Sequence, residues 1–335
     1  MEAKKWIGVD IHKKQLTVCI ILETGQKEVK RYERNSAGIS DFLREIDKDT
    51  VIGIESTTWT WGLAKRAKER AKDVLILNTV ELKNLMDKTK KTDRIDAAKI
   101  AVIIRRFEKE ELSTCAIKTE KWALVKGLLN IREKLVRQKV ETKNLIIATL
   151  DYWGIEIEKK LFISYKRDKA FLENIALEKE LKEEIINQYE LTEQFDSSIK
   201  EVDLKINGLC CSDKGYQAIT KNINGIGVTC GAYLTSKIEN IERFDDQKKL
   251  VAYLGLAPKV NSSDDKNKGG HISGNTDKAL LRVLVQAAWA SVRYDPEMRY
   301  YYETLKLRMA GQKAIIAIAR KLIVKVYYTM KEIKA

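Results

Sequence analysis

Residues 88–98 read KTKKTDRIDAA, and this stretch points to the fold and the chemistry of the chain. Its two carboxylates, Asp93 and Asp96, are three residues apart, so a helix beginning after Thr92 would place them on one face, about 5–6 Å apart. Such close carboxylates repel each other unless a cation lies between them, and Mg²⁺ suits oxygen ligands of this kind. Helix capping by Asp93, with Asp96 complementing the helix dipole, is the alternative explanation. Acids elsewhere in the chain decide between the two.

The composition predicts a polyanionic partner. The 335 residues carry a formal net charge of +14, which favours nucleic acid first and an anionic membrane surface second, with plain solubility as the alternative. No apolar run reaches 18 residues and no signal-peptide core opens the sequence, so we expect a cytoplasmic chain with no membrane span. Five cysteines without metal-ligand spacing and only two histidines argue against a structural zinc site.

Apolar runs and helical patterns alternate in the first third of the chain. Strands are expected at residues 6–9, 15–22, 27–32, 51–54 and 74–77, and helices at 35–46, 58–71 and beyond Asp96. This order, βββαβαβα, is typical of a mixed α/β layer fold. Asp10 and Glu55 each directly follow one of the apolar runs, where loops deliver functional groups at the edge of a sheet. Taken singly, each would also suit a turn or an exposed charge.

The four acids together indicate an RNase H-like pattern. An acid on the first strand, an acid after the fourth strand and an acidic pair on a later helix converge in that fold on two Mg²⁺ ions. The ions assist phosphoryl transfer, and their charge offsets the crowded carboxylates.

Three segments resemble a known family. GVDIHKKQLTV (8–18), GIEST (53–57) and KTDRIDAAKIA (91–101) are similar to the DEDD motif of insertion-sequence transposases related to the Piv pilin-gene invertase, which are described as bridge-RNA-guided serine recombinases. The resemblance assigns metal binding and catalysis to Asp10, Glu55, Asp93 and Asp96 in a RuvC-like domain. Family members often carry a glycine three residues after the second acid, where this chain has Thr58.

The middle of the chain predicts long helices. Apolar residues recur at helical spacing over 121–152 and 168–207, and those at 195, 199, 202 and 206 are heptad-like. An antiparallel or intermolecular coiled coil that forms an oligomer interface is one interpretation, and a helical hairpin packed on its own domain is the other. The basic outer face of the first helix could follow a nucleic-acid backbone.

The last third carries two features for nucleic-acid contact. Gly225 and Gly227 open a helix, which would direct backbone N–H groups at a phosphate, although a tight inter-helix turn explains them equally simply. Beyond Pro258, a polar loop and the run ISGNTDKALLR (272–282) resemble the C-terminal transposase domain of the same family. The resemblance assigns DNA contacts to Lys278 and Arg282.

The same resemblance assigns a nucleophile to the polar loop. Counting from Pro258 gives Ser263, with Ser262 as the close alternative. A serine hydroxyl needs activation by a base or a metal, so the acids and the serine would have to meet. Without the family, a Ser-Ser pair in a polar loop would be ordinary loop chemistry.

These observations predict three domains: 1–118, an RNase H-like (RuvC-like) α/β domain; 119–207, a helical coiled-coil region; and 208–335, a mostly α-helical transposase domain. The function expected is a DNA recombinase of an insertion element that uses Mg²⁺, or Mn²⁺ in its place, and forms a phosphoserine link. By resemblance its partners are donor and target DNA and a non-coding guide RNA, and it assembles as a homo-oligomer, a dimer or a tetramer. The alternatives are a RuvC-like nuclease that uses water and a non-catalytic nucleic-acid-binding protein.

Overall fold

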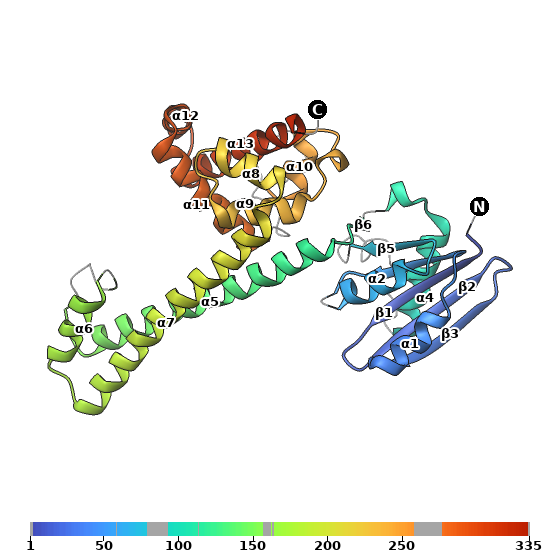
Figure 1. The fold of residues 1–335 in the computed structure, drawn as a ribbon, viewed down its shortest axis with the longest axis horizontal. Helices are drawn as coiled ribbons and strands as arrows, with labels where there is room; N and C mark the ends of the chain where they lie inside the picture. The colour runs from blue at the N-terminus through green and yellow to red at the C-terminus, as the bar shows by residue number, and fades with distance from the viewer. Residues whose placement is uncertain are drawn as a thin grey trace, which may run out of the picture. The chain divides into compact units, whose positions relative to one another are not determined.

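The computed structural model describes residues 3–57, 59–78, 93–112, 114–156, 162, 164–257 and 277–333. The chain divides into two compact units, Met1–Thr119 and Glu120–Ala335 (Figure 1). The predicted mixed α/β beginning and mostly helical remainder are confirmed. The three-domain division stays a prediction.

The first unit is built on a six-stranded sheet. Its elements are β1 (Lys5–Ile11), β2 (Gln15–Leu22), β3 (Lys27–Glu33), α1 (Ser36–Arg44), β4 (Thr50–Glu55), α2 (Thr60–Lys68), β5 (Asp73–Leu77), α4 (Asp93–Arg106), a 3₁₀ turn (Lys109–Glu111) and β6 (Thr114–Cys115). The strand order is β3-β2-β1-β4-β5-β6. β1, β4 and β5 run parallel, and the other neighbouring pairs are antiparallel. The sequence did not predict β6, and it extended the second helix to 58–71.

Helices cover both faces of this sheet. Ile7 and Val9 of β1 point to the face that α1 and α2 cover, where they share a core with Phe42 and Leu63. The opposite face carries α4, and Gly8 permits its close approach: a Cβ at Gly8 would lie 2.1 Å from the carbonyl oxygen of Ala97. Side chains of β1 therefore alternate between two covered faces, which explains why residues 6–9 of the strand carry no charged side chain.

The second unit is helical. Its elements are α5 (Glu120–Tyr152), α6 (Tyr165–Asn174), α7 (Lys179–Cys210), α8 (Lys214–Asn222), α9 (Val228–Ile238), a 3₁₀ turn (Ile241–Arg243), α10 (Gln247–Tyr253), α11 (Lys278–Tyr294), α12 (Pro296–Lys306) and α13 (Gly311–Glu332). The expected continuous helix over 168–207 is wrong, because α6 and α7 are separate. The chain breaks where Ile175 and Leu177 pack into the apolar cluster around Ile146 and Leu150.

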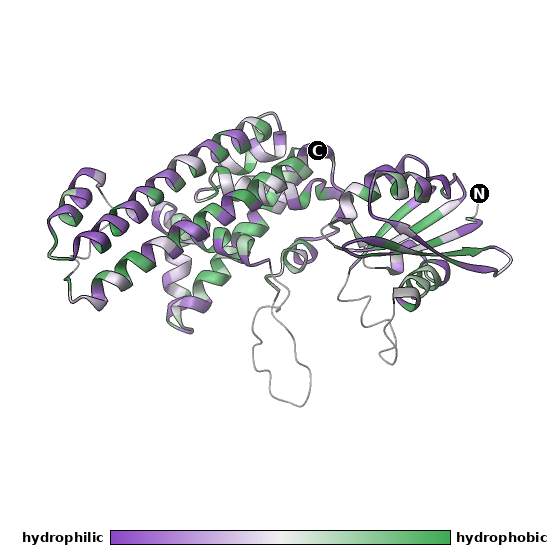
Figure 2. Ribbon diagram, turned by 90° about the horizontal axis from the view of Figure 1, so that it is seen from below, coloured by the Kyte–Doolittle hydropathy of each residue, from purple (hydrophilic) through white to green (hydrophobic). Residues whose placement is uncertain are grey.

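α5 and α7 form an antiparallel arm. Arg132 pairs with Asp203 and Lys139 pairs with Asp196, so a step of seven residues forward on α5 is a step of seven backward on α7. Hydrophobic and hydrophilic residues are interspersed along both helices (Figure 2). No helix in the described ranges combines the length and the apolar character that crossing a membrane requires.

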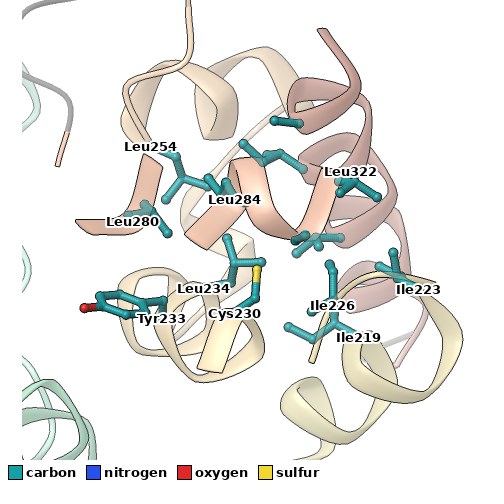
Figure 3. Packing of buried hydrophobic residues seen from close by; sticks show 14 of the residues in the cluster. Ile219, Ile223, Ile226, Cys230, Tyr233, Leu234, Leu254, Leu280, Leu284 and Leu322 are labelled. Atoms are coloured by element: carbon teal, nitrogen blue, oxygen red, sulfur yellow. The ribbon is translucent and has the colours of Figure 1, made fainter. Parts of the chain in front are cut away.

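The remaining helices enclose a large apolar core. In Figure 3, Leu234 of α9, Leu284 of α11 and Leu322 of α13 lie within one cluster with Cys230. Burial raises the pKa of the Cys230 thiol to about 12, so this side chain is neutral and contributes only packing.

Candidate functional site

Two of the predicted acids end neighbouring strands. β1 and β4 are parallel, with Val9 opposite Ile54, so Asp10 and Glu55 come next on their strands at the same end of the sheet. Because side chains alternate along a strand, Asp10 shares a face with Gly8, and Glu55 shares it with Gly53. Helix α4 covers that face. The two carboxylates therefore project from adjacent strand ends onto the same side of the sheet.

The direction of α4 brings its beginning to the same end of the sheet. Its last turn lies at the start of β1, where the Arg105 guanidinium is 5.2 Å from the ring centre of Trp6. Ala97 lies over Gly8 in the middle of the strand. The helix therefore runs antiparallel to β1, and its first residue, Asp93, comes one turn before Ala97 on the side of Asp10. Asp96 is half-buried, and the side chain of Asp93 lies outside the described residues.

A histidine that the sequence analysis gave no role contacts the first acid. His12 Nε2 is 2.9 Å from Asp10 Oδ2, a hydrogen bond, and Asp10 is only 7% exposed. The signal available in the sequence was the two-residue spacing, which puts both side chains on one face of an extended strand.

A third side chain continues the row of acids. Thr17 of β2 lies directly opposite Asp10 in the antiparallel pairing. Its hydroxyl is completely buried and has no hydrogen-bond partner among the described residues. Nothing in the sequence distinguished Thr17 from other strand threonines.

The donors near the strand ends suit a hard divalent cation. Carboxylate oxygens from Asp10 and Glu55 are the ligands that Mg²⁺ prefers, and an orphaned hydroxyl beside them offers one more polar atom. Among the side chains that the structure describes, which exclude that of Asp93, no three His, Cys, Asp or Glu gather closely enough to hold a metal ion. The chemistry of the donor set fits Mg²⁺, and the assignment of all four acids stays a prediction.

The two predicted glycines of the second unit differ in their surroundings. Gly225 has φ of +97°, and a Cβ there would meet the carbonyl oxygen of Ala287 at 2.4 Å, so this glycine permits close packing on α11. Gly227 precedes the first residue of α9 and has open space around its Cα. It opens into a cavity of 710 Å³ between α7, α9 and α11. The alternative of a tight inter-helix turn therefore describes Gly225 well, whereas Gly227 is accessible.

The predicted basic contacts lie on the first turns of α11. Lys278 is exposed and is the first residue of the helix, whereas Arg282 forms an ion pair with Glu133 of α5. Asp277 caps the helix by accepting hydrogen bonds from the backbone N–H groups of Ala279 and Leu280. Burial alone would raise the pKa of Asp277, but the hydrogen bond and charge of Lys237 outweigh burial. The pKa is therefore below its usual value, and the carboxylate is charged.

The predicted nucleophile, Ser263, and its alternative, Ser262, lie outside the described residues. The chain is anchored shortly before them, because Arg320 of α13 donates a hydrogen bond from Nε to the carbonyl oxygen of Leu256 at 2.6 Å.

Two family models match the chain in succession. Residues 7–154, which include all four acids, match a model named for DEDD transposases of the IS110 type and described as "Transposase". Residues 217–303, which include both glycines, the serine loop and the start of α11, match a model described as "Transposase IS116/IS110/IS902 family".

Curated relatives agree with the family models. The transposase for insertion sequence element IS1328 of Yersinia enterocolitica is 23% identical over 84% of this chain and 82% of its own length. A probable family 20 transposase of Pseudomonas aeruginosa is 21% identical over 94% of this chain and 93% of its own length. For the transposase of IS1111A of Coxiella burnetii, identity is 24% over 70% of this chain and 65% of the relative.

The chain is thus similar to insertion-sequence transposases. More particularly, its two matched regions are similar to family models named for the IS110 and the IS116/IS110/IS902 transposases.

Proposed function

We propose that this protein cuts and joins DNA strands as the recombinase of an insertion element. The observation that carries the proposal is the pair of carboxylates at adjacent parallel strand ends, Asp10 and Glu55, on the face that α4 covers. Three antiparallel strands followed by parallel ones, with this placement of acids, support an RNase H-like, RuvC-like identity for the first unit.

The acids of the first unit would hold the cation. Asp10, Glu55, Asp93 and Asp96 supply four carboxylates, and Mg²⁺, or Mn²⁺ in its place, is the ion that such oxygen donors select. When bound, divalent ions stabilise the attacking and leaving oxygens of a phosphoryl transfer. His12 holds the Asp10 carboxylate in place through its hydrogen bond, and Asp10 is only 7% exposed.

Ser263 would be the nucleophile, with Ser262 as the alternative. Its Oγ forms a bond to the phosphorus of a DNA phosphodiester, the phosphorus–oxygen bond to one strand end breaks, and that end leaves as a hydroxyl after taking up a proton. The phosphoserine ester conserves the bond energy, so the reverse attack by another strand end rejoins DNA without an energy-rich cofactor.

Nucleic acid would bind along basic surfaces of the chain. The net charge of +14, the accessible helix beginning at Gly227 and the exposed Lys278 support contacts to phosphates. Arg282 would need to exchange Glu133 for a phosphate to take part. Donor and target DNA, a non-coding guide RNA and a dimeric or tetrameric assembly in the cytoplasm, at the nucleoid, complete the proposal.

A cleavage assay on supercoiled DNA with Mg²⁺, run with and without the RNA that co-purifies with the protein, tests the acids. Asp10→Asn should abolish cleavage, whereas Asp41→Asn, a matched change at an exposed acid of α1 in the same unit, should leave it intact. Cleavage that survives in Asp10→Asn would remove the acid site from the mechanism, and no cleavage by the wild-type protein in any divalent ion would favour a non-catalytic binding protein.

Trapping of a protein–DNA adduct tests the serine. The wild-type protein should give a covalent adduct that survives denaturation, and Ser263→Ala should not. An adduct that is lost in Ser262→Ala and kept in Ser263→Ala would assign the nucleophile to Ser262 instead. Full cleavage by Ser263→Ala without any adduct would favour the nuclease that uses water. Sequencing of RNA that co-purifies with the protein, followed by strand-exchange assays with and without that RNA, tests the guide.

A further inference from the structure

Three buried hydroxyls lack a hydrogen-bond partner in the part of the chain that the structure describes. They belong to Thr17, Thr235 and Ser291. Thr235 and Ser291 lie in the helical unit, on α9 and α11. Thr17 alone of the three lies beside the candidate acid site.

Pairing of β1 with β2 fixes the position of Thr17 relative to the acids. Directly opposite residues of antiparallel strands have Cβ atoms about 4.5–5.5 Å apart and point to the same face. Thr17 is opposite Asp10, and Asp10 and Glu55 are the next residues after the paired Val9 and Ile54 on neighbouring parallel strands. The three side chains therefore form one row across β2, β1 and β4, with strands about 4.8 Å apart.

Helix α4 packs on the face of the sheet that carries this row of side chains. Cys19 and Ile21, which follow Thr17 on the same face of β2, pack against Ala97 and Ala101 of α4. Thr17 is 0% exposed. Its hydroxyl is therefore enclosed between the sheet and the helix, on the side where Asp10 presents its carboxylate.

An unpaired hydroxyl in such a place is destabilising. A buried polar group without a partner lowers the stability of the fold, and valine, which has the same shape, would avoid that loss. The hydroxyl can both donate and accept a hydrogen bond. Mg²⁺ keeps several of its own water molecules when carboxylates bind it, and those waters donate hydrogen bonds to acceptors close to the site.

We propose that Thr17 is an outer-sphere ligand of the cation site: its hydroxyl accepts a hydrogen bond from a water of the divalent ion that Asp10 binds. The inference rests on the proposed function of the acids and adds a positioning residue to them. Groups that hold a metal site from the outer shell typically change metal affinity by about 10- to 100-fold when removed.

Mn²⁺ binding to the full-length protein, measured by calorimetry and by electron paramagnetic resonance of the free ion, tests this role. Thr17→Val should weaken Mn²⁺ binding about 10- to 100-fold. Thr17→Ser, which keeps the hydroxyl, should bind within about 3-fold of wild type. Thr235→Val removes an equally buried, equally unpaired hydroxyl far along the chain and should leave Mn²⁺ binding unchanged.

Melting temperatures in EDTA provide the second readout. Without divalent ions, Thr17→Val should melt at the wild-type temperature or above it, since an unsatisfied polar group has been removed. A clearly lower melting temperature for both Thr17→Val and Thr17→Ala would mean that the hydroxyl already has a structural partner, and would overturn the inference.

The outcomes separate this inference from the function on which it rests. Equal Mn²⁺ affinity in Thr17→Val and wild type would refute the role of Thr17 and leave the acid site standing. A wild-type protein that takes up no Mn²⁺, or an Asp10→Asn variant that binds it as tightly as wild type, would refute the acid site itself and the role of Thr17 with it.

Discussion

Substitution of Gly8 by alanine should separate α4 from the sheet. The added Cβ would lie 2.1 Å from the carbonyl oxygen of Ala97 and 2.4 Å from the backbone nitrogen of Ala101. Both atoms belong to the backbone of the helix, so no side-chain rotation can relieve the overlap. The helix itself has to move.

The required movement can be worked from these distances. Cβ atoms essentially never approach other heavy atoms within 3.0 Å, so the oxygen of Ala97 must retreat by at least about 0.9 Å. Overpacking of this kind costs about 1–3 kcal/mol of unfolding free energy. A shift of about 1 Å in groups that position a reaction costs about 100-fold in rate. Since α4 begins with Asp93, Gly8→Ala should lower Mg²⁺-dependent cleavage by about that factor.

Hydrogen exchange measured by mass spectrometry can follow the two units separately. Peptides from β1 and α4 should exchange faster in Gly8→Ala, and peptides from α11 should not change. Gly53→Ala meets only side-chain methyl groups of Ile100 and Ile104 at 2.8 Å and should have a smaller effect. Gly62→Ala, with open space within helix α2, should stabilise by about 0.5–1 kcal/mol. Wild-type protection and activity in Gly8→Ala would refute the reasoning.

Three further outcomes concern the helical unit. Gly225→Ala combines a left-handed φ with a backbone overlap on α11, so calorimetry should show a loss of at least about 1–3 kcal/mol; an unchanged melting temperature would contradict the packing described. Burial raises the pKa of Asp277, but the hydrogen bond and charge of Lys237 outweigh burial and lower the pKa in the folded state. The charged Asp277 carboxylate therefore stabilises the folded protein above pH 3.8, and this contribution is lost as the pH falls below that value. Asp277→Asn should therefore flatten the acid unfolding transition below pH 3.8, and an unaltered acid transition would exclude this contribution. Arg320→Met leaves the buried carbonyl of Leu256 without its donor and should cost about 1–3 kcal/mol in thermal unfolding, whereas equal stability would show that the hydrogen bond is dispensable.

Local pattern was enough to predict most of the first unit. The run at 51–54, bounded by polar residues, is confirmed as β4 within one residue at each end. β6 escaped prediction because two residues paired to β5 leave no periodic pattern. The break between α6 and α7 contains neither glycine nor proline, so only the packing of Ile175 and Leu177 at the end of the arm determines it.

The residues of the candidate site also differ in whether the sequence could predict them. Asp10 and Glu55 were predictable because each follows an apolar strand, and parallel pairing then brings them together. The contact of His12 with Asp10 was within reach of strand periodicity. Thr17 was not, because the absence of a partner for its hydroxyl depends on how α4, eighty residues further along the chain, closes over β2.

The arm of α5 and α7 joins an apolar core at each end, and two ion pairs link its helices between those ends. Val125 and Leu129 join the large core at one end, Ile146 and Leu150 join the small core at the other, and every residue of α5 between Leu129 and Ile146 is at least partly exposed. The ion pairs Arg132–Asp203 and Lys139–Asp196 are partly exposed, so salt screens them and weakens their contribution to stability. The arm is therefore held by buried apolar packing at both ends. Its middle should bend more easily as ionic strength rises, while the packing at the two ends stays intact.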